Sequence, residues 1–224
     1  MTDLILSSNI GAMRSYGQYC GLARALDVLG DRWTLLVVRE LLDGPRRYNE
    51  LLGGLPGIAT NLLVERLRSL EADGVVRRRE DGRYTLTRWG EDLHEVVYAL
   101  GRWAGPLMAR PRGEDEFRPN WIRHMVIARF EGHDPERRDL SVELCYDDEP
   151  VTLISVGGRV HLVPGGSADA DITIAGPLEG VVGLLLGRLD PAEAAERGVT
   201  HTGDVRRLRA LRPRGERPQA LSMR

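Results

Sequence analysis

The segment from Gly57 to Gly90 places a helix directly before a two-stranded hairpin, and this order constrains the fold more than any other feature of the sequence. Leucines recur at helical spacing between Thr60 and Asp73, which predicts an amphipathic helix with one apolar face. Gly74 suits the end of that helix, because glycine readily adopts the left-handed conformation found after a helix C-terminus. The segments VVRRR and RYTLT then flank an Asp-Gly pair, which is a strong indication of a hairpin turn.

The polar face of this helix lies opposite its leucines. Because successive helical residues are rotated by about 100°, Asn61, Glu65 and Arg68 fall nearly opposite the apolar stripe. Such a face is either an ordinary solvated surface or a surface free to enter the major groove of DNA, which is about as wide as one helix. Arg66 lies nearer the apolar stripe, and we expect it to form an ion pair within the fold.

Further helices are predicted on both sides of this segment. Apolar residues recur at helical spacing within 22–29 and 33–41, and Pro45 suits the first turn of a short helix that reaches residue 52. After the hairpin, one side of another amphipathic helix carries Leu93, Val97, Leu100, Trp103 and Leu107. The order of helices, hairpin and final helix is that of a winged helix-turn-helix.

Eight residues of this region are candidates for contact with double-stranded DNA. Arginines in the hairpin would reach phosphates or the minor groove beside a helix that occupies the major groove. The alternative is that each of these side chains is simply exposed to solvent, and for Arg46 and Arg47 the two interpretations are equally supported. The candidate contacts are Arg46, Arg47, Thr60, Asn61, Glu65, Arg68, Arg79 and Arg83.

The first half of the chain resembles the HxlR-type winged-helix transcription regulators. The matching pieces, in order, are a Tyr-Cys pair, LGDRWTLLVVREL, GPRRYNEL, PGI, LxxRLxxLExxGVV and YxLTxxG, within residues 16–110. The resemblance implies a homodimer on a roughly palindromic operator, with the N-terminal segment and a helix from Gly90 to Met108 at the subunit contact. Ala59 stands where the family usually has the serine that caps the recognition helix, so Thr60 could take over that role.

The second half of the chain follows a charged, proline-rich segment at 110–120 and predicts an α/β unit. Alternating residues at 140–146 predict a strand, VTLISVGGRVHLVP a hairpin, and ADITIAG a strand before an apolar helix. A short helix, a strand VTHTG and a last helix VRRLRAL complete the order. This arrangement resembles the sterol-carrier-protein-like fold, which implies a small sheet backed by helices around an apolar tunnel for a hydrophobic ligand. The residues that would line the tunnel, or simply form a core, are Met125, Phe130, Leu144, Leu153, Leu162, Val182, Leu185 and Leu186.

The expected architecture is therefore of the α+β class. It comprises a winged helix-turn-helix domain for DNA binding and dimerisation at 1–110, a sterol-carrier-like domain at 119–212, and a flexible basic tail at 213–224. The net charge of −2 argues against a chain that coats nucleic acid along its whole length.

Several other classes of protein find no support in the sequence. The motifs GxSxG, HExxH, CxxC and the P-loop are absent, so we expect neither an enzyme nor a bound cofactor or metal. The longest apolar run, Val181 to Leu186, is too short to span a bilayer, and the N-terminus lacks the pattern of a signal peptide. We therefore expect a cytoplasmic protein without a membrane partner.

Three hypotheses about function follow from these patterns. The leading one is a dimeric repressor that responds to a small hydrophobic ligand in its C-terminal domain. The second is a thiol-based redox sensor, because Cys20 precedes the first helix with Arg24 one turn on; a small buried cysteine is the plainer interpretation. The third is a lipid-binding protein whose winged helix serves dimerisation.

Overall fold

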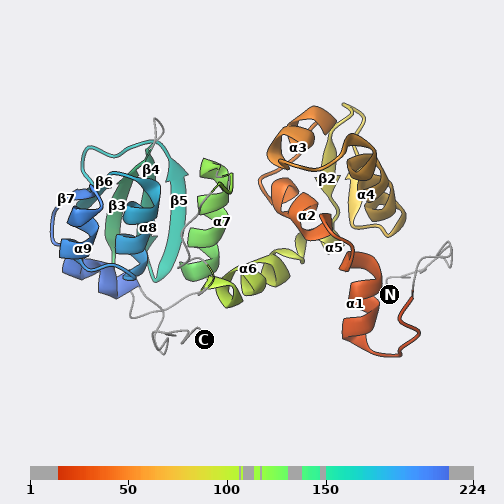
Figure 1. The fold of residues 1–224 in the computed structure, drawn as a ribbon, viewed down its shortest axis with the longest axis horizontal. Helices are drawn as coiled ribbons and strands as arrows, with labels where there is room; N and C mark the ends of the chain where they lie inside the picture. Colours follow the sequence, from red (N-terminus) through yellow and green to blue (C-terminus); the bar gives the residue numbers. More distant parts are fainter. Residues whose placement is uncertain are drawn as a thin grey trace. The chain divides into compact units, whose positions relative to one another are not determined.

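The computed structural model describes residues 15–105, 107, 114–116, 118–130, 138–146 and 150–211. The chain divides into two compact units, Met1–Val97 and Tyr98–Arg224 (Figure 1). The expected tail at 213–224 and the segment before residue 15 lie outside the described residues, and the domain limits drawn from the sequence stay predictions. No helix in the described ranges has the length and apolar character that crossing a membrane requires.

The first unit contains the predicted helices and hairpin in the predicted order. The helix α6 begins in this unit and runs past its boundary. The elements are α1 (Gly21–Leu29), α2 (Thr34–Leu42), α3 (Tyr48–Gly54), α4 (Thr60–Ala72), β1 (Val76–Arg78), β2 (Tyr84–Leu86), α5 (Arg88–Glu91) and α6 (His94–Trp103).

The leucine stripe of α4 forms the centre of the first unit. Leu63, Leu67 and Leu70 are at most 1% exposed, as the helical period predicts. They belong to one apolar cluster with residues of α2, α3 and the hairpin, including Val37 and Leu51, both fully buried. Burial of a leucine side chain contributes about 1.5–3 kcal/mol relative to exposure, so this stripe fixes which side of α4 remains in water.

The helix that the family resemblance places from Gly90 to Met108 is divided in the structure. The short α5 ends at Glu91, and the backbone N–H of Leu93 donates to the Gly90 carbonyl at 3.2 Å, a tight turn that precedes α6. The helix α6 ends at Trp103, shortly before a Gly-Pro pair, and a residue that precedes proline disfavours the helical conformation. Met108 lies outside the described residues.

The second unit is a five-stranded mixed sheet with helices. All the strands predicted for it are confirmed. Its remaining elements are α7 (Pro119–Phe130), β3 (Leu140–Cys145), β4 (Val151–Val156), β5 (Arg159–Pro164), β6 (Ile172–Ala175), α8 (Leu178–Leu186), α9 (Pro191–Glu196), β7 (Thr200–Thr202) and the 3₁₀ helix η2 (Val205–Leu211).

The strand order in this sheet is β5-β4-β3-β6-β7. The central pair β3 and β6 is parallel, with Val142 opposite Ile172, and the other pairs are antiparallel. Gly157 and Gly158 connect β4 to β5 with φ of 54° and 76°, which a two-residue hairpin turn of this hand requires and glycine supplies without strain.

The last helix predicted from the sequence is present as a 3₁₀ helix. Its apolar residues Val205, Leu208 and Leu211 are three residues apart, and a 3₁₀ helix has three residues per turn. All three therefore share one side of η2, where Leu208 and Leu211 are at most 1% exposed.

The core of the second unit contains all eight residues proposed to line a tunnel. Six of them are buried, and Met125 and Leu162 are partly buried against the same cluster. From Gly180 to Leu186 the helix α8 is apolar on every side and buried, and Figure 1 shows α8 lying across the sheet. These positions suit a core, and their role in ligand binding stays a prediction.

Candidate nucleic-acid interface

The outward face of α4 carries half of the predicted DNA contacts. Because the leucine stripe holds the opposite side of the helix in the core, this face is left in solvent. Its exposed residues are Thr60, Asn61, Glu65 and Arg68.

The N-terminus of α4 has no side-chain cap. Ala59 occupies the N-cap position with φ −73° and ψ 143°, and Thr60 is the first helical residue, so Thr60 does not take over the cap. The Tyr48 hydroxyl donates to the Thr60 carbonyl at 2.9 Å and thereby ties α3 to the start of α4. Nothing in the spacing of Tyr48 in the sequence indicated this hydrogen bond.

Arg66 forms the ion pair within the fold that its position predicts. Its guanidinium binds the Asp31 carboxylate, and its side chain is only 11% exposed. A second nitrogen of the same group lies 3.0 Å from the Glu65 carboxylate. The negative charge of Glu65 is therefore partly balanced on the exposed face, which weakens its repulsion of a nearby phosphate.

The hairpin turn contains three residues rather than the Asp-Gly pair alone. The N–H of Arg79 donates to the Arg83 carbonyl at 2.8 Å, and the N–H of Gly82 donates to the Arg79 carbonyl at 3.0 Å. Gly82 has φ 80°, so this is the three-residue loop in which a left-handed glycine follows the turn. Both arginines at the ends of the loop are exposed.

The hairpin of β1 and β2 is the wing of this fold, and an acidic residue lies between its two arginines, Arg79 and Arg83. One oxygen of Asp81 is 3.9 Å from Arg79 and the other is 3.9 Å from Arg83. The pKa of Asp81 is held below its ordinary value, mainly by the Arg83 N–H that donates to it and further by the neighbouring guanidinium groups. Asp81 is therefore ionised at neutral pH and reduces the positive charge that the wing presents.

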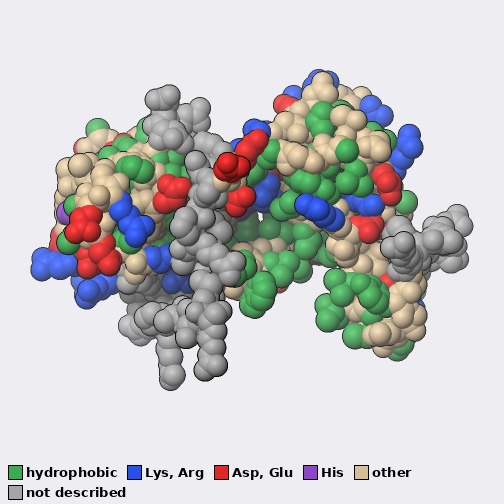
Figure 2. Space-filling view, in the orientation of Figure 1, with side chains coloured by type: hydrophobic (Ala, Val, Ile, Leu, Met, Phe, Trp, Pro, Cys, Tyr) green, Lys and Arg blue, Asp and Glu red, His purple; other side chains and the backbone are tan. Residues whose placement is uncertain are grey.

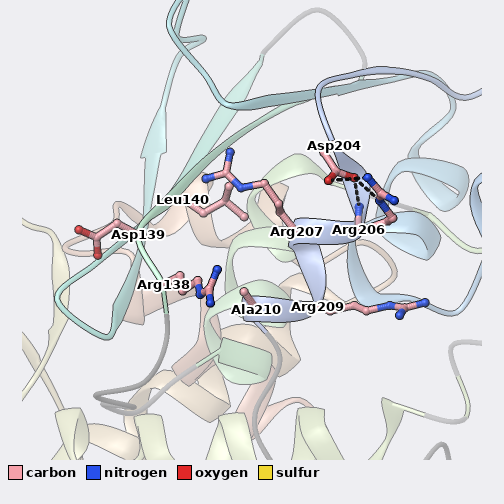
Figure 3. Close-up of a pocket in the computed structure, with 8 residues that line it drawn as sticks. All are labelled: Arg138, Asp139, Leu140, Asp204, Arg206, Arg207, Arg209 and Ala210. Carbon is pink, nitrogen blue, oxygen red and sulfur yellow. Dashed lines mark hydrogen bonds and ion pairs between the residues drawn. The ribbon is translucent and has the colours of Figure 1, made fainter.

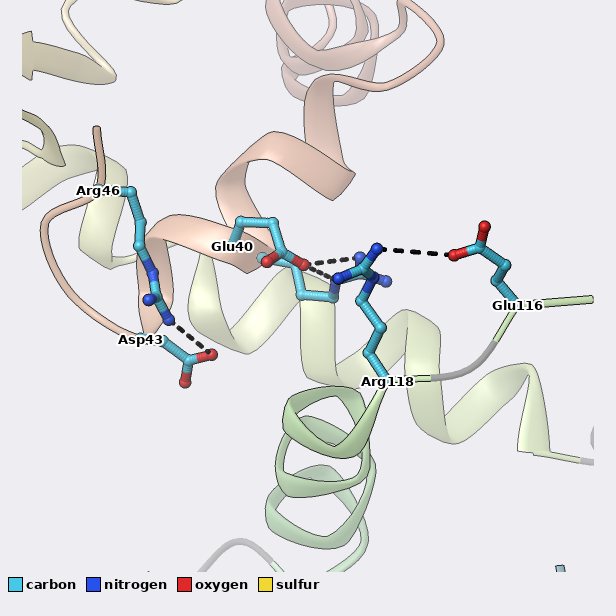
Figure 4. Close-up of polar contacts among 6 residues, drawn as sticks. Glu40, Asp43, Arg46, Glu116 and Arg118 are labelled. Atoms are coloured by element: carbon cyan, nitrogen blue, oxygen red, sulfur yellow. Dashed lines mark hydrogen bonds and ion pairs between the residues drawn. The ribbon is translucent and has the colours of Figure 1, made fainter. Parts of the chain in front are cut away.

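The two arginines before α3 occupy different environments. Arg46 exchanges backbone hydrogen bonds with Tyr84 at 2.9 and 2.7 Å, which docks this stretch beside β2. Its guanidinium is 3.9 Å from Asp43 (Figure 4), so only part of its charge is available to a phosphate. Arg47 is exposed at the N-cap of α3.

Two helices expose apolar side chains that the described core does not cover. On α6 these are Val96, Leu100 and Trp103, which are 42%, 44% and 76% exposed. Their spacing of four and three residues places them along one stripe. On α1, Leu22 and Leu26 are 70% and 40% exposed. Figure 2 shows hydrophobic side chains on the surface of both helices.

Cys20 is exposed, so its interpretation as a buried apolar residue is wrong. It occupies the N-cap of α1, and the pKa of its thiol is lowered, mainly by the backbone N–H of Ala23 and then by that of Leu22. In contrast, burial and then the charge of Glu143 raise the pKa of Cys145, which is half-buried in β3. The two thiols therefore differ in the fraction that is ionised at neutral pH.

Comparisons with known proteins agree on the N-terminal half of the chain. The model of the HxlR-like helix-turn-helix family matches residues 28–111. The HTH-type transcriptional regulator sll1512 of Synechocystis is 37% identical over 90 residues, which cover 38% of this chain and 67% of that protein. The regulator YkvN of Bacillus subtilis is 33% identical over 104 residues, which cover 44% of this chain and 88% of YkvN. Among solved structures, quinone-bound YodB from B. subtilis is 37% identical, covering 38% of this chain and 94% of that one, with a TM-score of 0.36.

The uncapped start of α4 predicts a stabilising substitution. Ala59→Ser would place a hydroxyl where it can accept a hydrogen bond from the first turn, and we expect it to raise the free energy of unfolding of the first unit by about 1 kcal/mol. Urea denaturation followed by circular dichroism measures the change. Ala72→Ser, at the exposed last residue of the same helix, is the control and should lower that free energy by a few tenths of a kcal/mol. An equal effect of both substitutions would contradict a helix that begins at Thr60.

Proposed function

Because the chain belongs to the HxlR-like helix-turn-helix family of transcriptional regulators, we propose that it is a homodimeric repressor that binds a roughly palindromic operator. In each subunit α4 enters the major groove, and the wing arginines contact the flanking backbone. A small hydrophobic ligand in the C-terminal unit changes the affinity for the operator. The proposal of DNA binding is supported chiefly by the exposed polar face of α4, which lies next to a hairpin with arginines at its tip.

The side chains on α4 suit the reading of base edges. Asn61 lies in the first turn, where a recognition helix usually contacts bases, and an asparagine amide pairs with adenine through two hydrogen bonds. Glu65, one turn further on, can accept a hydrogen bond from cytosine. Arg68 is seven residues beyond Asn61, or about 10 Å along the helix, which suits a guanine or a phosphate. Arg79 and Arg83 supply contacts that do not depend on sequence.

The exposed apolar stripe of α6 supports a subunit contact. In an isolated chain Val96, Leu100 and Trp103 would remain in water, and exposed patches of this kind mark interaction surfaces. A second copy that presents the same stripe about a two-fold axis would cover them, since a symmetric dimer uses the same patch twice. Two-fold symmetry in the protein also explains a palindromic operator.

A ligand response of the C-terminal unit is supported only by its order of elements and its aliphatic core. The eight core positions offer apolar contacts, which suits a hydrophobic molecule. A ligand among them has to separate α7 or α8 from the sheet, and it changes operator binding only if it prefers one of two conformations of the dimer.

DNA binding through the wing has a measurable salt dependence. On a duplex from upstream of its own gene, the affinity should fall steeply as salt rises, because each arginine–phosphate contact releases counterions. Replacing both Arg79 and Arg83 with Gln should weaken operator and random duplexes alike and reduce the salt slope by about two. Asn61→Ala should weaken only the operator complex. Fluorescence anisotropy measures all three effects.

The control for this experiment is Arg159→Gln, which removes an exposed arginine from β5 of the other unit. It should leave both the affinity and the salt slope unchanged. Failure of the unaltered protein to bind any upstream duplex at low salt would contradict the proposal, and so would an uptake of apolar ligand without any DNA binding.

The subunit contact is tested by a charge placed on the stripe. Leu100→Glu should convert the dimer to a monomer of 24.9 kDa, because an unpaired carboxylate is costly to bury. Light scattering coupled to size exclusion measures the mass. Gly101→Glu adds the same charge at an exposed position of α6 that lies about 100° around the helix from Leu100, and this variant should remain dimeric. A monomeric unaltered protein would show that the stripe serves another purpose.

Redox control through Cys20 is the second candidate, and the lowered pKa of its exposed thiol favours it. A thiolate at this site attacks hydrogen peroxide to give a sulfenic acid, with hydroxide as the leaving group. Cys20→Ser should bind the operator normally but keep its affinity after treatment with peroxide. Cys145→Ser should respond to peroxide as the unaltered protein does. A response that survives Cys20→Ser excludes this mechanism.

A further inference from the structure

The second unit has a hollow lined by arginines that takes no part in the function proposed above. Its volume is about 330 Å³, and it lies where the chain enters β3 beside η2 (Figure 3). The size falls at the lower end of the range of small-molecule sites. The lining residues are Arg138, Asp139, Leu140, Asp204, Arg206, Arg207, Arg209 and Ala210.

Two guanidinium groups lie on the β3 side of η2. Figure 3 shows Arg138 beside Ala210 and Arg207 beside Leu140, whereas Arg206 and Arg209 extend to the other side of η2. Among the residues that the structure describes, the guanidinium of Arg138 has no ion-pair or hydrogen-bond partner. Within the same described ranges, the guanidinium of Arg207 contacts one acidic group, with one nitrogen 3.0 Å from the Asp171 carboxylate.

The acidic groups around the hollow are engaged within the fold. Asp139 accepts a hydrogen bond from the N–H of Gly157 at 3.0 Å. Asp204 binds the guanidinium of Arg206 through both oxygens, at 2.8 and 3.1 Å. Asp171 also accepts hydrogen bonds from the N–H and hydroxyl of Ser141, at 2.9 and 3.0 Å. Asp204 and Asp171 are thus paired with arginines, whereas Asp139 keeps its negative charge, and Figure 3 shows its carboxylate directed away from Arg138 and Arg207. The positive charge on the β3 side of η2 is therefore that of Arg138, together with the nitrogens of Arg207 that do not contact Asp171.

We propose that this hollow binds a small organic anion whose phosphate or carboxylate group lies between Arg138 and Arg207. A guanidinium offers paired N–H donors that match the oxygens of either group, and such charge-assisted hydrogen bonds are the strong ones. Ala210, which is partly exposed, provides apolar surface for the rest of the molecule, whereas Leu140 is only 3% exposed and belongs to the core. The site is separate from the core positions discussed above, and its occupation does not depend on operator binding.

The geometry favours a small molecule over a DNA backbone. The guanidinium groups of Arg138 and Arg207 lie in a recess beside η2, whereas those of Arg206 and Arg209 extend to its other side. A duplex presents one phosphate per strand about every 3.4 Å, which calls for arginines spread along a surface rather than gathered in a recess.

The test is calorimetric titration of the full chain with phenyl phosphate, inorganic phosphate and phenol. Phenyl phosphate combines the anionic group with an apolar body, and the other two probes supply each part alone. We expect phenyl phosphate to bind most tightly, inorganic phosphate more weakly, and phenol not at all. Arg138→Gln should weaken phenyl phosphate about tenfold or more, the effect of one lost charge-assisted hydrogen bond.

Two further variants separate binding from folding. Arg207→Lys keeps a positive charge facing Asp171 but loses the paired donors, and it should weaken phenyl phosphate while the circular dichroism spectrum stays unchanged. Arg197→Gln removes an exposed arginine at the end of α9, outside the hollow, and should have no effect on binding.

Three results would overturn the proposal. The first is equal affinity of phenyl phosphate for the unaltered chain and Arg138→Gln. The second is an equal loss in Arg197→Gln, which would reveal a general charge effect. The third is a loss of DNA affinity in Arg138→Gln without any change in phenyl phosphate binding, which would assign the hollow to nucleic acid.

Discussion

The burial of one leucine stripe determines how the N-terminal unit can be used. Leu63, Leu67 and Leu70 are each at most 1% exposed and hold α4 against the rest of the unit, so rotating the helix would bring apolar surface into water. The polar face is thereby fixed in orientation before any partner arrives, and little conformational freedom remains to be lost on binding. The Tyr48 hydroxyl bonded to the Thr60 carbonyl fixes the same helix at its uncapped end.

The position of the hairpin β1–β2 depends on the same core as the orientation of α4. Its strands contribute Val76 and Leu86 to the same core, and the backbone bridge between Arg46 and Tyr84 joins it to the stretch before α3. The arginines at its tip are thus carried by a rigid support, although their side chains are exposed. The second unit has an apolar interior, and four of its arginines line the hollow beside η2.

The spacing of apolar residues predicted the helices and strands that bury one face in a core. It did not predict features that depend on a single contact. The alternation of Leu140, Val142 and Leu144 was sufficient to identify β3, because one face of that strand is buried. The division of the last winged-helix segment was not predictable from its apolar stripe, because the first residue of that stripe, Leu93, already lies at the turn between α5 and α6. The contacts of Asp139 with Gly157 and of Asp171 with Ser141 and Arg207 could not be foreseen either, because they join residues that are far apart in the sequence.

The acidic residue at the wing tip has a consequence for how such a regulator would find its operator. Asp81 lies 3.9 Å from both wing arginines and opposes each phosphate they approach. Contacts to phosphates carry no sequence information, so this opposition lowers the affinity for random and specific duplexes by the same factor. The ratio of the affinity for the operator to the affinity for random DNA is preserved, while the residence time of the protein on random DNA shortens. A protein that leaves wrong positions quickly surveys more of the genome between encounters with the right one.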